Sequence, residues 1–219
     1  MKRPLSLLFL LLLLAGCGSK PSPAWISAGH RQMENFKEDF LTGQSPAITE
    51  IHFRKAIEEM KKGGDLDLLG KAWLTKMALQ TAVLAEMDAG DYPKIAAALT
   101  VPANANYHRF LMGDATVDVS LLPESYRPFW EALRSRDAAK TSAAVAAIDD
   151  PLSRLIASGL AVRQGLETEP ICRTAVETAA EKGWKRALLA WLKRLKLLHE
   201  TAGDPTKAAA IQARIDLMK

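Results

Sequence analysis

Hydrophobic residues recur at helical spacing along most of the chain from residue 24 onward. Met33, Phe36 and Phe40 are separated by three and four residues, which places them on one face of a helix. One segment, residues 117–121, instead alternates apolar and polar residues, but no second segment of that kind is available to pair with it, so we expect a loop there. The pattern predicts an all-α domain over residues 24–219.

Short polar breaks divide this pattern into separate helices. Gly43 is followed by Ser45-Pro46, and serine favours the position just before a helix while proline favours its first turn. Asp65, Asp137 and Asp150 stand at other expected starts. The main helices predicted in this way cover residues 24–42, 46–62, 65–89, 123–133, 138–148, 151–164, 169–182, 184–198 and 205–218.

The final third of the chain reads as two successive helical hairpins, at about 151–182 and 183–218. Their length is close to the ~34-residue unit of tetratricopeptide repeats, and Gly90-Asp91-Tyr92, at a turn between two helices, also resembles that family. Leu188 and Trp191 are larger than the residues such a repeat favours at close contacts. The resemblance implies a tetratricopeptide-like α-solenoid, and an irregular helical bundle is the alternative.

The first seventeen residues have the features of an export signal. Two cations, Lys2 and Arg3, precede an apolar run over residues 5–14, which is shorter than the ~20 residues of a membrane-spanning helix. The sequence Leu14-Ala15-Gly16-Cys17 then resembles the lipobox of bacterial lipoproteins. That resemblance implies cleavage before Cys17, a diacylglyceryl group on its thiol and an acyl group such as palmitate on its new amine.

The chain therefore divides into a signal peptide at 1–16, a lipidated tether at 17–23 and the helical domain at 24–219. The six residues between Cys17 and Ala24 reach at most about 20 Å, so the domain stays close to its membrane. Gly18, which follows the lipidated cysteine, is compatible in this family with transfer to the outer membrane of a Gram-negative cell, facing the periplasm. Nucleic acid is not an expected partner of an exported protein.

The positive charge is concentrated at the C-terminal end. The whole chain carries +4, whereas residues 182–219 contain nine Lys or Arg and three Asp or Glu, a net +6. Lysines and arginines flank the apolar stripe of the helix at 184–198, a pattern found in surfaces that contact an acidic partner or a membrane, and in core helices with a solvated face. We expect Lys193 and Arg194 to lie at the rim of a partner-binding surface.

No local motif indicates catalysis, a cofactor or a metal. The four histidines, at 30, 52, 108 and 199, are never three or four residues apart, and no Cys-x-x-Cys or Gly-x-Ser-x-Gly occurs. Cys172 is expected to be a small buried residue in a helix. Glu58, Glu86 and Glu131 are the helical glutamates that could serve a cell-wall hydrolase.

These observations lead to one expected function and two alternatives. The expected function is a non-catalytic, lipid-anchored scaffold for envelope proteins, and the resemblance to tetratricopeptide lipoproteins implies outer-membrane, secretion or pilus assembly. The first alternative is an envelope enzyme acting on peptidoglycan, built around a carboxylate such as Glu58, Glu86 or Glu131. The second is a purely structural lipoprotein.

Overall fold

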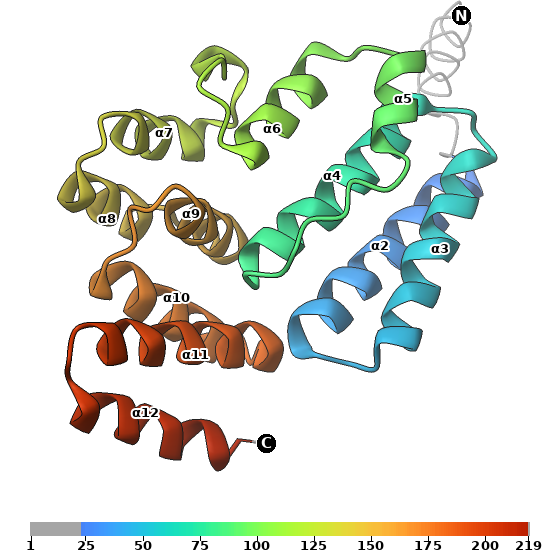
Figure 1. Cartoon of the computed structure of the whole chain (residues 1–219). Coiled ribbons are helices and arrows are strands. Elements are labelled where there is room, and N and C mark those ends of the chain that lie inside the picture. Colours follow the sequence, from blue (N-terminus) through green and yellow to red (C-terminus); the bar gives the residue numbers. More distant parts are fainter. Residues whose placement is uncertain (1–22, 219) are drawn as a thin grey trace, which may run out of the picture.

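The computed structural model describes residues 23–218, so the signal peptide, Cys17 and all of the tether except Pro23 lie outside it. Over this range the chain forms eleven α-helices and two 3₁₀ turns, with no β-strand (Figure 1). The residues expected to form a loop at 117–121 include one of these 3₁₀ turns. The elements are α2 (Ala24–Thr42), α3 (Pro46–Lys61), α4 (Leu66–Ala82), α5 (Tyr92–Ala98), α6 (Pro102–Met112), η2 (Val119–Leu121), η3 (Glu124–Tyr126), α7 (Arg127–Arg134), α8 (Ala138–Ala146), α9 (Pro151–Arg163), α10 (Glu169–Glu181), α11 (Lys185–Thr201) and α12 (Pro205–Asp216).

The helices are joined both by neighbour contacts and by contacts between distant parts of the chain. Helices α2 and α3 form an antiparallel hairpin, and α10, α11 and α12 pack one after another (Figure 1). In addition, α4 packs against α9, and α11 returns to contact α2. A solenoid in which each repeat touches only its neighbours does not contain such contacts. Buried apolar side chains from α2 to α12 form one connected cluster.

Acidic and hydroxyl side chains begin several helices as the sequence predicts. Asp65 accepts a hydrogen bond from the Leu68 amide, Asp150 from the Ser153 amide, and Thr168 from the Ile171 amide. Ser45 does precede α3, but its hydroxyl accepts no capping hydrogen bond. Proline in the first turn therefore begins this helix without the predicted side-chain cap.

Helix α4 is shorter than the predicted 65–89, because it ends at Ala82. Side chains from distant helices form hydrogen bonds with backbone carbonyls at this point, in place of further helical hydrogen bonds. Arg163 of α9 donates to the Thr81 hydroxyl at 2.9 Å and to the Ala85 carbonyl at 2.8 Å. The Trp191 indole donates to the Ala82 carbonyl at 2.8 Å, and Leu84 adopts a left-handed backbone with φ 58°. The apolar pattern continues past Ala82, but the helix does not.

Helices α4 and α9 approach closely at a small residue. A Cβ atom added to Gly159 would lie 2.2 Å from the carbonyl oxygen of Thr81. The adjacent Ser158 is fully buried and donates to the Arg154 carbonyl of its own helix. The sequence-based interpretation of Ser158-Gly159 as a site of close helix packing is confirmed.

Candidate functional site

A groove lies between the start of α11 and the turn that joins α2 to α3. Its volume is about 490 Å³, and three cations of α11 border it: Lys185, Arg186 and Lys193. Its apolar surface comes partly from Leu189 and Ala190 of the same helix. The remaining lining residues are Thr42, Gly43, Gln44, Pro46, Val83 and Ala85. We call this surface the basic groove.

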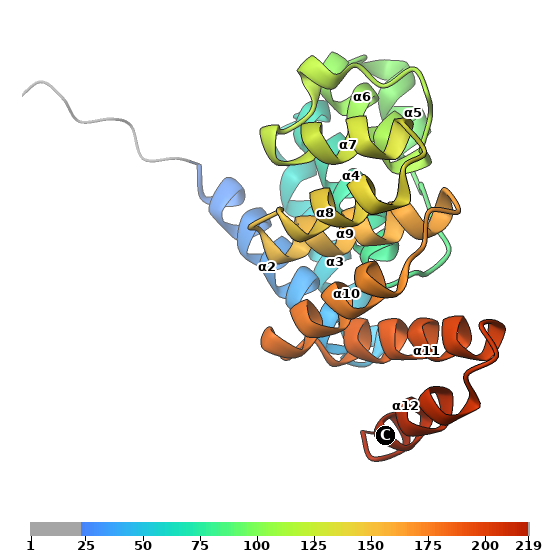
Figure 2. The ribbon, with the colours of Figure 1, turned by 90° about the vertical axis from the view of Figure 1, so that its left-hand side faces the viewer.

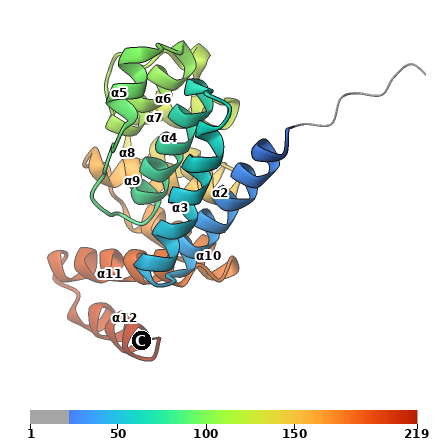
Figure 3. The same cartoon turned by 90° about the vertical axis from the view of Figure 1, so that its right-hand side faces the viewer.

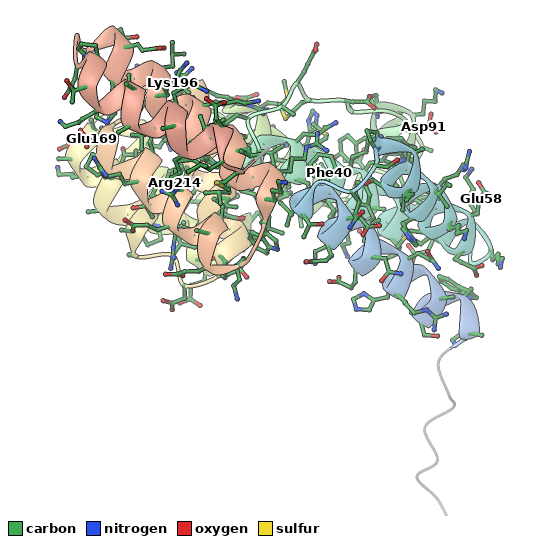
Figure 4. All side chains as sticks on the ribbon, turned by 90° about the horizontal axis from the view of Figure 1, so that it is seen from below. Phe40, Glu58, Asp91, Glu169, Lys196 and Arg214 are labelled. Atoms are coloured by element: carbon green, nitrogen blue, oxygen red, sulfur yellow. The ribbon has the colours of Figure 1, made fainter. Side chains whose placement is uncertain are left out.

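Contacts across the groove fix the relation between α2 and α11. The Arg186 guanidinium lies 4.0 Å from the centre of the Phe40 ring, at cation–π distance. Figure 4 shows Phe40 where α2 meets the C-terminal helices. Burial lowers the pKa of Arg186 from its ordinary value, although the side chain remains charged at neutral pH. Gly43 ends α2 in a left-handed conformation directly beside Arg186.

The two residues predicted to form a partner-binding rim face different surroundings. Lys193 is exposed and borders the basic groove. Arg194 instead makes two hydrogen bonds to the carboxylate of Glu167, one of them 2.7 Å from Nε to Oε1. Glu167 also accepts a hydrogen bond from the Cys172 thiol at 3.3 Å. Arg194 is therefore tied to the segment that joins α9 to α10, and Lys193 remains accessible to a partner.

The charges of the basic groove are not neutralised by nearby carboxylates. Among residues 23–218, no Asp or Glu forms an ion pair with Lys185, Arg186 or Lys193. Glu86, the residue after Ala85, is exposed and lies in the connection between α4 and α5. Helix α3 begins at the groove and α2 ends there, so their dipoles oppose each other and the positive potential comes from the side chains of α11. The groove is suited to an anionic group carried on an apolar segment.

A second, larger groove of about 750 Å³ lies among α4, α6, α9 and the segment with the 3₁₀ turns. Two of its lysines are already paired, Lys71 with Asp67 at 2.8 Å and Lys37 with Glu34 at 3.0 Å. Burial raises the pKa of Tyr126 on its wall to about 12, so this hydroxyl stays protonated at neutral pH. The lining also includes the carboxylate of Asp150, which caps α9 and has no ion pair among the described residues, and Arg127, which donates to the Leu122 and Ser120 carbonyls.

The glutamates considered for hydrolysis do not gather at either groove. Glu58 lies on α3, Glu86 in the connection after α4 and Glu131 on α7, and all three are exposed. Glu58 pairs with Lys61 of its own helix at 2.9 Å. Figure 4 shows it pointing outward, far from Glu169 and Lys196. None of the three lines the basic groove or the larger groove.

Cys172, His52 and His199 contact neighbouring carboxylates within the fold. Cys172 is fully buried, which confirms the expectation of a small buried residue, and burial together with Glu167 raises the pKa of its thiol. His52 lies 3.5 Å from Asp39, and the buried His199 lies 3.8 Å from Glu169. Within the described residues, no group of three or more His, Cys, Asp or Glu is arranged to hold a metal ion.

Sequence reasoning identified Lys193 but not the groove around it. The missing information was that the α2–α3 turn lies beside the start of α11. These two segments are more than 140 residues apart in the chain, as are Trp184 and Glu38, which are in contact. The cations at 185 and 186 were visible as part of the charged flank of the helix. Their grouping with Lys193 could not be inferred, because nothing local shows that α2 meets α11.

Comparison with known families identifies one segment. Residues 1–17 match the prokaryotic membrane lipoprotein lipid attachment site. No curated protein and no solved structure matches the chain. The chain thus carries the attachment site of a lipoprotein of the bacterial cell envelope, with Cys17 as the last residue of the matched segment. Separately, no helix within 23–218 has the length and apolar character needed to cross a bilayer.

Proposed function

We propose that this lipoprotein is a non-catalytic scaffold that holds a partner protein near the membrane through its basic groove. The observation that carries the proposal is the grouping of Lys185, Arg186 and Lys193 around one groove, where no carboxylate of the described residues pairs with them. Charged side chains that are left exposed in a group of one sign attract groups of the opposite sign and speed their association.

The groove fits an acidic segment of a protein better than a small charged metabolite. It is open, and its floor is apolar where Val83, Leu189 and Ala190 line it. An extended or helical peptide that alternates carboxylates with apolar side chains would satisfy both the cations and the floor. The Arg186 side chain packs against Phe40 and is already ordered in the free protein. Binding a partner therefore costs little additional side-chain entropy at this residue.

The partner is expected to be another protein of the envelope, because the lipid confines this chain to a membrane surface. A location on the outer membrane facing the periplasm, in a Gram-negative cell, is part of the proposal. The resemblance of the last third of the chain to tetratricopeptide hairpins suggests a scaffold role, although the groove itself lies where α11 meets the α2–α3 turn and not on stacked hairpins. On that basis the proposed role lies in outer-membrane, secretion or pilus assembly.

The proposal predicts that reversing the charge of the groove weakens partner capture. In cells that express tagged protein, Lys185→Glu combined with Lys193→Glu should reduce the partner recovered after crosslinking by about tenfold, equivalent to about 1.4 kcal/mol. The matched control combines Lys94→Glu with Lys140→Glu, because these lysines are also exposed but lie on α5 and α8. Circular dichroism of both variants checks that the helices remain.

Two results would contradict the proposal. Equal recovery of the partner from the groove variant and the control would remove the basic groove from the account. A protein that no partner accompanies, and whose purified form cleaves peptidoglycan, would favour the enzyme instead. In that case, substituting Glu58, Glu86 and Glu131 in turn by Gln would identify the required carboxylate.

A further inference from the structure

The first turn of α2 carries apolar side chains at the point where the chain enters the domain. Trp25 is half-buried, and its indole packs over Gly63, where an added Cβ would lie 2.3 Å from the ring. Because Gly63 lacks a side chain, the indole can lie flat against the backbone at the end of the hairpin. Ile26, the next residue, is 40% exposed.

An apolar hollow continues from Ile26 along the same side of the molecule. It has a volume of about 320 Å³, and Met33, Met60 and Leu68 contribute to its walls. Helices α2, α3 and α4 therefore all present apolar surface next to the start of the domain. The lining of the hollow also includes His30 and two ion-paired lysines, Lys37 with Glu34 and Lys71 with Asp67. The local cations do not give this end a large net charge, because Lys61 pairs with Glu58 and Lys62 with Glu59.

The position of this end relative to the membrane follows from covalent length. Only six residues separate Cys17 from Ala24, and they span at most about 20 Å. Figure 2 shows the first turns of α2 projecting from the body of the molecule, and Figure 3 shows the same from the opposite side. The first side chains beyond the tether are thus those of the projecting end.

We propose that the end of the domain formed by Trp25, Ile26 and the adjoining hollow lies against the bilayer that holds the lipid anchor. Tryptophan favours the interface between headgroups and acyl chains, because its ring is apolar and its N–H can reach water. Since the lysines there are paired, the contact does not depend on anionic lipid. A neutral phosphatidylcholine bilayer is a sufficient partner.

This contact fixes how the protein stands on the membrane. Helix α2 has 19 residues, which corresponds to a length of about 28 Å. One of its ends carries Trp25, and the other ends at Gly43 on the basic groove. The helix therefore separates the two surfaces along its length. The membrane contact does not depend on the function proposed for the groove.

Tryptophan quenching by lipid tests this placement. The mature lipidated protein is reconstituted into phosphatidylcholine vesicles with brominated acyl chains, and its fluorescence is compared with that in unbrominated vesicles. Bromine quenches only nearby indoles, so the wild-type protein should lose part of its emission. Trp25→Phe should reduce this quenching at least about threefold. Trp184→Phe should leave the loss of emission unchanged, because Trp184 precedes α11 and its indole contacts Glu38 in the second half of α2.

A second pair of variants keeps all the tryptophans, so that a change in quenching reports membrane contact and not the loss of an emitting indole. Ile26→Glu should lower the quenching, whereas Ile48→Glu should not, because Ile48 is at least as exposed but lies at the opposite end of the α2–α3 hairpin. Circular dichroism confirms that each variant is folded. Equal quenching in the wild type and Trp25→Phe, no quenching in the wild type, or equal effects of the two glutamates would overturn the proposal.

Discussion

Thr81, at the end of α4, is the residue around which two distant parts of the chain are joined. Its hydroxyl accepts a hydrogen bond from Arg163, and its carbonyl oxygen lies where a side chain on Gly159 would have to be. Its own hydroxyl also donates to the Met77 carbonyl at 3.0 Å. The contact between α4 and α9 thus requires that Gly159 has no side chain and that the adjacent Ser158 is small.

Gly159→Ala should therefore destabilise the protein, because the new methyl group meets backbone that cannot rotate away. We expect a loss of about 2 kcal/mol in the free energy of unfolding, typical of overpacking in a core. Urea unfolding followed by circular dichroism measures it. Gly70→Ala is the matched control, since Gly70 is also helical and its nearest neighbour, at 3.3 Å, is a side-chain atom of Asn104. A loss no larger than in this control would show that the helices do not pack as closely as described.

At the scale of elements, the C-terminal helix is the least supported of the longer helices. The substantial contacts of α12 are with α11, and only Ala208 and Ile215 of the helix are buried. By contrast, α4 contacts α5, α6 and α9 and buries ten of its residues. Helices with few buried contacts open locally at a lower free energy than the core does.

Amide hydrogen exchange should therefore be fastest in α12 among the longer helices and slowest in α4 and α9. Mass spectrometry of peptides from the labelled protein measures this order directly. Detergent-solubilised lipoprotein and vesicle-bound lipoprotein should give the same order, because α12 lies far from the end that contacts the bilayer. Protection of α12 equal to that of α4 would contradict the packing described here.

The helices themselves could be predicted because their causes are local. Aspartate or threonine at the caps and the spacing of apolar residues act within one or two turns, and both predicted α9 and α10 nearly to the residue. The end of α4 could not be predicted in this way. Arg163 and Trp191, which take its last backbone groups, come from helices formed much later in the chain.

The candidate site shows the same distinction between local and distant causes. Charge and helical spacing pointed to Lys193, which is at the groove. The same evidence pointed equally to Arg194, but the carboxylate that holds it belongs to Glu167, 27 positions earlier in the chain. Sequence alone does not say which of two neighbouring cations is already paired, because pairing depends on how α10 and α11 pack.

At the scale of the whole molecule, the two surfaces have complementary roles. The end with Trp25 faces the membrane, and the basic groove at the other end of α2 remains accessible to a partner. The lipid supplies the anchor, and α2 supplies the separation between the membrane and the partner. Under this account, loss of the lipid would leave the groove intact but would remove it from the surface where the partner is met.

The most direct test is a photocrosslinking amino acid placed at Gln44 in living cells. Gln44 is exposed, uncharged and on the wall of the basic groove. We expect one main crosslinked envelope protein, which disappears when Cys17→Ser removes the lipid. The same probe at Lys140 on α8 should not give this product. No crosslink from Gln44, or the same product from both positions, would contradict the proposal that this lipoprotein holds a partner through the basic groove.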